Sequence, residues 1–485
     1  MKRRLVALGI ALVILAGLGG VYFLLDKKGT VSSELSSDTT ESTTSLLQGV
    51  SGKTVVKSAN IVSFSLKNQN GSLNAYKKDD KWYVEGLEDA DFSQEALSMT
   101  AYALSDITAA RTIDSPDDDI AKYGITEFSA KAIGKSEQGE TVILTVGDET
   151  SDGKYRYVAV EGEKRIYMIS SASAQYYMGS VDDYINKSVD SINADGITYI
   201  KVTRPEKDEI EIEYDPNNAL TKGFSEGSGL AALIMNKPYE NAIVYPFDLK
   251  EEMLSSLNEL KPEKLVSAEK TDGKDYGLDK PKTHIELKDS ENRSIIVDVG
   301  DSVTIENEVY RYARFNGKNE IFLTSAAVIA DFENADASYI IQPFIALHPR
   351  SNVEKIEIKN KDKDYTVFFK TEGDKKIAVD DEGVKRDNRN TYINDKLIEK
   401  EKFSDFYEAV TGISFDDIIT DYTIEGNVTA KIEYTLSNGE TDSIEFHDYD
   451  SNFYITEKGK GAYMLVSKQD IRALVDYAQR LITEE

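Results

Sequence analysis

Cysteine is absent from this chain of 485 residues. The protein therefore forms no disulfide, holds no zinc ion through thiolates and has no cysteine nucleophile. A lipid-modified N-terminal cysteine, which anchors bacterial lipoproteins, is excluded as well. Any attachment to a membrane has to come from another feature of the sequence.

Histidine is scarce, with three residues in the chain: His284, His348 and His447. They lie far apart and form no H-x-x-x-H or H-E-x-x-H spacing of the kind that binds zinc. His284 and His447 fall in segments expected to be strands, and His348 falls in a His-Pro-Arg turn. The sequence therefore predicts no histidine-based metal site.

Neither acidic runs nor glycines form a recognisable ligand loop. The acidic runs are Asp117 to Asp119, Asp182 to Asp183 and Asp380 to Glu382, and none has the D-x-[DN]-x-[DN]-G spacing of a calcium loop. The glycines of phosphate-binding loops are clustered, whereas Gly71, Gly139 and Gly317 are isolated. We predict no metal ion, no cofactor and no ATPase activity.

Basic residues are outnumbered, with 57 Lys and Arg against 86 Asp and Glu, and the formal charge is -29. Such a surface repels phosphate backbones, so nucleic acid is not an expected partner. With 40% hydrophobic residues most of the chain is expected to be globular. The length predicts two to four domains.

One long hydrophobic run is present, from Leu5 to Leu25, and it contains no charged residue. At about 1.5 Å per residue it matches the ~30 Å hydrocarbon core of a bilayer. Lys2, Arg3 and Arg4 precede it, so the positive-inside rule places the N-terminus in the cytoplasm and the remainder outside. A cleavable signal peptide is the alternative, but its apolar stretch is typically shorter and no A-x-A site follows. We expect a single-pass anchor in the cell membrane.

The rest of the chain divides into a stalk and three modules. Residues 29–54 are rich in Ser and Thr and cannot bury enough apolar surface to form a core. The expected segments are the cytoplasmic tip and anchor at 1–28, the stalk at 29–54, module 1 at 55–190, module 2 at 191–346 with an insertion at about 214–245, and module 3 at 347–485.

Ordered repeats support the three modules. The first two expected repeats each have a Tyr-Gly element, a strand ending in Val-Gly-Asp, a tyrosine-rich strand and a closing strand, and the third repeat matches this order more loosely. The matched segments are Lys122 to Ile125, Asp275 to Leu278 and Asp421 to Ile424; Thr141 to Asp148, Ser294 to Asp301 and Asp442 to Asp448; Tyr155 to Val158, Tyr310 to Ala313 and Asn452 to Ile455; and Arg165 to Ile169, Glu320 to Thr324 and Ala462 to Val466. Their period-two alternation predicts half-buried antiparallel strands.

The first half of each module also matches. The opening strands are expected at Ile61 to Leu66, Ile197 to Val202 and Val353 to Ile358, each followed by an amphipathic helix. Asp91 with Gln94, and Asp248 with Glu251, resemble capping boxes for the first two of these helices. Ser170, Thr324 and Ser467 are expected to cap the closing helices. The predicted fold is α+β, with antiparallel sheets covered by helices on one face.

The order of these elements resembles a bacterial repeat family of unknown function, number 4340 in the domain-of-unknown-function series. The resemblance rests on Lys81-Trp82-Tyr83-Val84 at the end of a hairpin, a helix, the Tyr-Gly element, Val-Gly-Asp and a tyrosine-rich strand pair. Copy three lacks the glycines. The resemblance implies an accessory role beside an ABC-type transport system, similar to gliding-type exporter accessories, and implies no catalytic residues.

One short motif points to catalysis. Gly223-Phe224-Ser225-Glu226-Gly227 fits the G-x-S-x-G nucleophile elbow of a serine hydrolase. An elbow needs a buried strand directly before the serine, whereas Asp215 to Lys222 has the composition of a turn. We therefore interpret the motif as a loop in the insertion and expect no enzyme.

Tyrosine is abundant, with 28 residues. Alternating tyrosines usually pack on a sheet, but an exposed aromatic face binds glycan or protein. Tyr155, Tyr157, Tyr310 and Tyr312 recur around an arginine and are the predicted interaction surface. The leading hypothesis is an extracytoplasmic accessory or interaction protein. The alternative is a protein that binds cell-envelope glycan, and a serine hydrolase using Ser225 is the remote alternative.

Overall fold

The computed structural model describes residues 53–57, 60–69, 71–114, 119–217, 233–361, 363–371, 377–379, 385–387, 389–420, 422–457 and 462–483. The predicted anchor from Leu5 to Leu25 and nearly all of the stalk lie outside these residues. Within the described ranges, no helix is both long and apolar enough to cross a membrane.

The first sheet has the strand order β4-β3-β2-β7-β8-β9-β10-β6. Its strands are β2 (Ile61–Asn68), β3 (Gly71–Lys78), β4 (Lys81–Val84), β6 (Arg111–Ile113), β7 (Ala130–Ser136), β8 (Thr141–Glu149), β9 (Tyr155–Val160) and β10 (Ile166–Ser170). Strands β1 (Lys53–Lys57) and β5 (Asp106–Ala109) form a separate antiparallel pair. The α-helices are α2 (Gln94–Ser105), α3 (Ser171–Ala174) and α4 (Val181–Tyr184).

The second sheet has the order β14-β13-β12-β11-β16-β17-β18-β19-β15. Its strands are β11 (Ile197–Arg204), β12 (Lys207–Tyr214), β13 (Leu233–Lys237), β14 (Ala242–Ile243), β15 (Lys264–Ser267), β16 (Thr283–Asp289), β17 (Ser294–Ile305), β18 (Glu308–Phe315) and β19 (Ile321–Ser325). The α-helices are α6 (Pro246–Glu252), α7 (Ala326–Asn334) and α8 (Ala337–Ile340).

The third sheet has the order β25-β24-β21-β20-β27-β28-β29-β30-β26. Its strands are β20 (Val353–Asn360), β21 (Asp364–Thr371), β24 (Arg389–Ile393), β25 (Lys396–Ile398), β26 (Asp417–Ile419), β27 (Val428–Leu436), β28 (Thr441–Asp448), β29 (Phe453–Glu457) and β30 (Tyr463–Ser467). Strands β22 (Ile377–Val379) and β23 (Lys385–Asp387) pair apart from it. The α-helices are α9 (Lys400–Thr411) and α10 (Lys468–Thr483).

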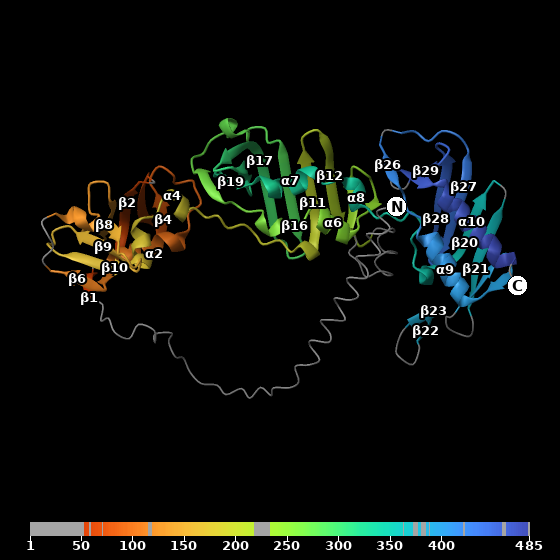
Figure 1. Ribbon diagram of the computed structural model, residues 1–485, viewed down its shortest axis with the longest axis horizontal. Coiled ribbons are helices and arrows are strands. Elements are labelled where there is room, and N and C mark those ends of the chain that lie inside the picture. Colours follow the sequence, from red (N-terminus) through yellow and green to blue (C-terminus); the bar gives the residue numbers. More distant parts are fainter. Residues whose placement is uncertain are drawn as a thin grey trace, which may run out of the picture. The chain divides into compact units, whose positions relative to one another are not determined.

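The strand order of the first sheet recurs in the other two, which each add one edge strand, β14 or β25 (Figure 1). In each, the opening strand pairs on one side with its hairpin partner and on the other with the strand that follows the Tyr-Gly position. The three central pairings are Phe64 with Gly134, Ile200 with Leu287, and Ile356 with Tyr434. The α+β class and the tandem sheet modules predicted from the repeats are confirmed.

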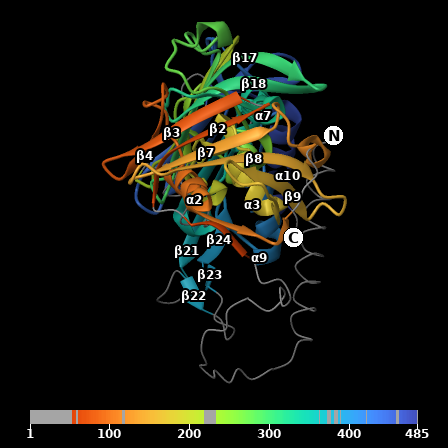
Figure 2. The ribbon, with the colours of Figure 1, turned by 90° about the vertical axis from the view of Figure 1, so that its left-hand side faces the viewer.

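Burial alternates along the strands, as expected for a sheet with one covered face. In β7, Ala130, Ala132 and Ser136 are buried, whereas Lys131 and Lys135 are exposed. Helix α2 packs against β2, β4 and β7 with its apolar stripe, and α3 lies against β9 and β10 (Figure 2). In the third module α9 buries a similar stripe of aromatic and aliphatic side chains.

The predicted helix starts need correction. The Oγ of Ser93, not Asp91, caps α2 by accepting the N–H of Ala96 at 3.2 Å. Gln94 instead holds β4, because its amide accepts from the N–H of Trp82 at 2.7 Å and donates to the same residue's carbonyl at 3.0 Å.

In the second module, α6 starts at Pro246, a residue whose fixed φ favours the first helical turn, so Asp248 lies inside the helix. Helix α7 follows Ser325, one residue after the predicted cap. Thr324 belongs to β19 and donates its hydroxyl to the carbonyl of Lys261 at 3.1 Å.

Candidate functional site

The Tyr-Gly elements each end a short 3-10 helix. Tyr123 ends the helix Ile120–Tyr123, and Tyr276 ends the helix Lys274–Tyr276. The glycine that follows has a φ of 70° in both modules, a left-handed conformation that favours glycine. The chain thereby reverses and passes close to β8 in module 1 and to β17 in module 2.

The second motif glycine makes that close passage possible. A β-carbon on Gly147 would lie 2.1 Å from the carbonyl oxygen of Tyr123, and one on Gly300 would lie 2.0 Å from that of Tyr276. No side chain fits at either distance. The Tyr-Gly and Val-Gly-Asp motifs therefore recur because their backbones pack directly on each other.

The tyrosine-rich strands complete this cluster. The ring of Tyr157 meets that of Tyr123 edge to face at 5.1 Å, and Tyr312 meets Tyr276 at 5.0 Å. Such edge-to-face pairs stabilise a fold beyond the area that they bury. Tyr157 and Tyr312 are half-buried in these contacts.

Tyr155 and Tyr310, the other two tyrosines of the predicted interaction surface, are also half-buried. They stand across the strand register from Ser170 and Ser325, at the starts of α3 and α7. The hydroxyl of Tyr310 donates to Glu308 at 2.5 Å, and this hydrogen bond raises the pKa of the tyrosine. A role of the four tyrosines in binding stays a prediction.

In the third module the register differs by one residue from the sequence match. Ser467 pairs with Phe453, not Asn452, so Phe453 takes the place of Tyr155. Tyr454 then takes the place of the arginine found in the first two modules. The hairpin between β29 and β30 is one residue shorter than the repeat alignment assumed, which a sequence comparison without gaps misses.

In the first two modules, the arginine of the tyrosine-rich strand is the most polar member of the cluster. In module 2, Arg311 donates through Nε and one terminal nitrogen to the carbonyl of Gly300, at 3.1 and 2.9 Å. Its other terminal nitrogen lies 3.0 Å from both carboxylate oxygens of Glu333. Thr283 also donates to Glu333. In module 1, Arg156 donates to the carbonyl of Gly147 at 3.2 Å.

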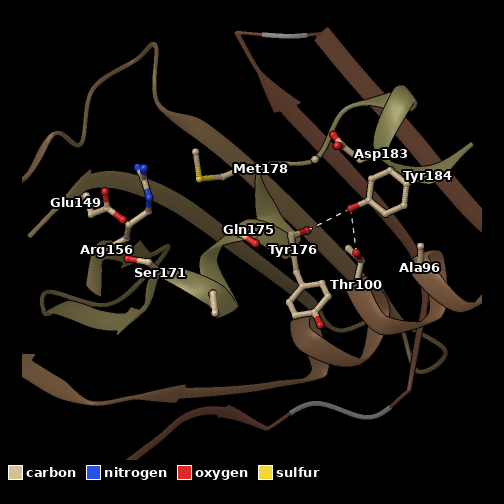
Figure 3. A pocket seen from close by; sticks show the side chains of 12 residues that line it. Ala96, Thr100, Glu149, Arg156, Ser171, Gln175, Tyr176, Met178, Asp183 and Tyr184 are labelled. Atoms are coloured by element: carbon tan, nitrogen blue, oxygen red, sulfur yellow. Dashed lines mark hydrogen bonds between the residues drawn. The ribbon is translucent and has the colours of Figure 1, made fainter. Parts of the chain in front are cut away.

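Module 1 has a cavity of about 620 Å³ beside Arg156 (Figure 3). Arg156 and Glu149 stand at one end of it, and Tyr176 and Tyr184 at the other. The hydroxyl of Tyr184 lies 2.9 Å from that of Thr100 and donates to the carbonyl of Tyr176 at 3.4 Å. Burial raises the pKa of Tyr184, so its hydroxyl stays neutral at physiological pH.

A second cavity of about 350 Å³ shares Arg156 and Met178 with the first. Asp148, Phe128 and Ala130 are among its other lining residues. Phe128 is 85% exposed, the highest value among the large apolar side chains of the described residues. Arg156 thus lines two cavities of the module.

Two of the three histidines each contact one aspartate. His284 on β16 contacts Asp298 at 2.8 Å, and His348 contacts Asp442 at 2.8 Å, while His447 lies on β28. Among the described residues, no three His, Asp or Glu side chains are grouped so as to hold a metal ion.

The acidic runs and the serine motif are placed only in part. Asp182 forms an ion pair with Lys187 at 2.8 Å, and Asp183 caps α4 through the backbone and hydroxyl of Ser180. Asp117, Asp118, the run from Asp380 to Glu382 and Ser225 lie outside the described residues.

The three sheets share a common strand order, and the first two also share the cluster of Tyr-Gly, Val-Gly-Asp and Tyr-Arg-Tyr. These features define a tandem α+β repeat protein. The chain belongs to the family described as Domain of unknown function (DUF4340), whose model matches residues 82–243 and 245–439. Each matched segment starts within one module and ends in the next. No curated protein and no solved structure matches the chain.

Proposed function

We propose that this protein is a non-enzymatic accessory protein, tethered to the cell membrane by Leu5 to Leu25 and presenting its modules outside the cell. Its partners are the permease and ATPase subunits of an ABC-type transport system. The uncharged N-terminal run and the family resemblance support the tether and the partner. The tandem modules supply the surface that such a role requires.

The contacts of the recurring residues are the observation that supports a non-enzymatic role. In the first two modules, the repeated tyrosines, glycines and arginines contact one another: Tyr123 packs on Tyr157, Gly147 on Tyr123, and Arg156 on Gly147. Catalytic residues would point together at the place where a substrate's reacting group binds. These recurring residues instead contact the backbone and one another. The repeat therefore supports a folded framework whose exposed parts bind partners.

The test is crosslinking of the full-length protein in intact cells, purification in mild detergent and mass spectrometry. Recovery of permease and ATPase subunits is the expected result. A variant in which Leu5 to Leu25 is replaced by a cleavable signal peptide serves as the control, because it keeps the modules and loses the tether. Recovery of no integral membrane partner with the full-length chain would contradict the proposal.

A stacked aromatic pair favours glycan binding as a second candidate. The rings of Tyr76 and Tyr83 lie 5.8 Å apart at an interplanar angle of 23°, and Tyr76 lines a cavity of about 690 Å³ together with Glu85, Glu88 and Asn74. Aromatic faces next to carboxylates and amides suit the apolar face and hydroxyls of a sugar ring. Retention of the protein on purified cell wall, lost in Tyr76→Ala, would support it; equal retention of the variant would dismiss it.

A further inference from the structure

Arg156 and Arg311 occupy the same place in their modules. Arg156 pairs in register with Ile169, one residue before the capping Ser170, and Arg311 pairs with Thr324, one residue before Ser325. Each arginine donates to the carbonyl of the glycine in Val-Gly-Asp. The two guanidinium groups therefore start from equivalent backbone positions.

The two other members of the arginine network in module 2 are replaced in module 1. Glu333 is the eighth residue after Ser325, and the eighth residue after Ser170 is Met178. Thr283 pairs with Val299 across β16 and β17, and its counterpart Ala130 pairs with Val146 across β7 and β8. Module 1 thus keeps the arginine and loses both the carboxylate and the hydroxyl that supports it.

The loss leaves the guanidinium of Arg156 open to a ligand. Within the described residues its one hydrogen bond goes to Gly147, so most of its N–H donors have no protein acceptor there. Arg156, Met178 and Ala130 all line the 350 Å³ cavity. In module 2, by contrast, the side chains of Arg311 and Glu333 are only 13% and 21% exposed and pair with each other.

We propose that module 1 binds a carboxylate group in this cavity, on Arg156, in the place that the Glu333 side chain takes in module 2. The planar guanidinium matches a carboxylate through two parallel hydrogen bonds. Met178 and Phe128 supply apolar contact for the chain that bears the carboxylate. The cavity volume is at the small end of the range for ligand sites.

The charges nearby select a singly charged group. Glu149 faces Arg156 across the strand register, and Asp148 lines the same small cavity. Asp183 lines the larger cavity but is committed to its helix cap. No ion pair within 4.0 Å joins Arg156 to either acid in the described part of the chain, so neither acid occupies the N–H donors of its guanidinium. The two negative charges repel a doubly charged phosphate more strongly than a singly charged carboxylate.

The test is a calorimetric titration of the full-length protein in detergent with butyrate, and separately with the capped peptide acetyl-Gly-Glu-Gly-amide. Butyramide, which is neutral and of similar shape, is the ligand control. Saturable binding of butyrate or of the peptide, with about one site per chain, is expected. Preference for butyrate identifies a free small carboxylate as the source, and preference for the peptide identifies an acidic side chain.

Three single variants and one double variant locate the site. Met178→Glu supplies the missing carboxylate from within and should weaken binding at least tenfold, as should Arg156→Gln. Lys154→Gln makes the same charge change just before β9 and should leave binding unchanged. The double variant Thr283→Ala with Glu333→Met should leave Arg311 of the second module without its carboxylate partner. The number of carboxylates bound per chain should then rise from about one to about two.

Three results would overturn the proposal: no saturable binding of either carboxylate, binding unchanged in both Met178→Glu and Arg156→Gln, or tighter binding of inorganic phosphate than of butyrate. Circular dichroism of each variant establishes that it is folded, and Arg156→Gln keeps the test decisive if the half-buried charge of Met178→Glu prevents folding. The titration needs no transport subunit, so its outcome is independent of the proposed function.

Discussion

Gly147 and Tyr123 approach so closely that a β-carbon on the glycine would stand 2.1 Å from the carbonyl oxygen of the tyrosine. Module 2 repeats the relationship with Gly300 and Tyr276 at 2.0 Å. Two motifs that lie apart in the sequence are therefore one structural unit. Their co-occurrence in a chain predicts a strand packed on a 3-10 turn.

Gly147→Ala should destabilise module 1 by about 3 kcal/mol or more, because the methyl group meets backbone and not a flexible side chain. Gly139→Ala is the matched control: its turn is open, and only the left-handed φ of +86° costs about 1 kcal/mol. Urea unfolding of both variants measures the difference. Equal losses of unfolding free energy in the two variants would show that the backbone near Gly147 moves apart to fit the methyl group without strain.

Glu333→Gln should destabilise module 2 by about 2–4 kcal/mol, since it leaves the largely buried Arg311 without its counter-charge. Arg156→Gln in module 1 should change stability by only about 0.5 kcal/mol, because no carboxylate of the described residues is paired with it. Denaturant unfolding of both variants tests the asymmetry. Similar losses in the two modules would contradict it.

Asp289 should make module 2 sensitive to acid. Burial opposes ionisation of this carboxylate, but hydrogen bonds from the Arg293 side chain and from the N–H groups of Asn193, Arg293 and Glu291 lower its pKa to about 2. A lowered folded-state pKa means that its contribution to stability is complete above the unfolded pKa of about 4 and is lost as pH falls towards 2.

The measurement is the unfolding free energy of the wild type and of Asp289→Asn between about pH 6 and pH 2.5. The wild type should lose its advantage over the variant as the pH falls. Asp79→Asn, at an exposed turn, should follow the wild-type curve. A constant difference between wild type and Asp289→Asn across the range would refute the assignment.

Tyr434→Phe should cost about 1–3 kcal/mol, because the buried hydroxyl donates to the carbonyl of Ala346 at 2.9 Å and the variant leaves that carbonyl without its donor. Burial raises the pKa of Tyr434 well above its usual value, so alkaline titration should detect this tyrosine only on unfolding. Tyr310→Phe, which removes a hydrogen bond at the surface, is the control and should be nearly neutral.

The sequence predicts the sheets better than the helix ends. Period-two burial along β7 and the other repeated strands is a strong local pattern, so these strands follow from it, whereas the order in which they pair in each sheet does not. Helix starts depend on single side chains with several competing uses. Gln94 resembles part of a capping box, yet its amide bonds to the backbone of Trp82 on β4, while Ser93 caps the helix.

The arginine network could be predicted only in part. The repeated Tyr-Arg-Tyr pattern points to Arg156 and Arg311, but Glu333 has no local signal, because its carboxylate reaches the arginine from α7, a helix that follows the next strand. Thr283 is an ordinary strand residue by sequence. Only alignment of the first two modules on their strand registers shows that Met178 stands in the place of Glu333 and Ala130 in the place of Thr283.

The strand order has a consequence for how the protein is made. In every module the pairing at the centre of the sheet joins an early strand to one that is synthesised much later, as Phe64 joins Gly134. Contacts between distant parts of a chain form slowly, since the loop between them must close first. Under the proposed tethering, the N-terminal half of each module crosses the membrane before the C-terminal half. Its opening hairpin then lacks a central pairing partner until the second half has crossed. Export and folding would then be coupled one module at a time.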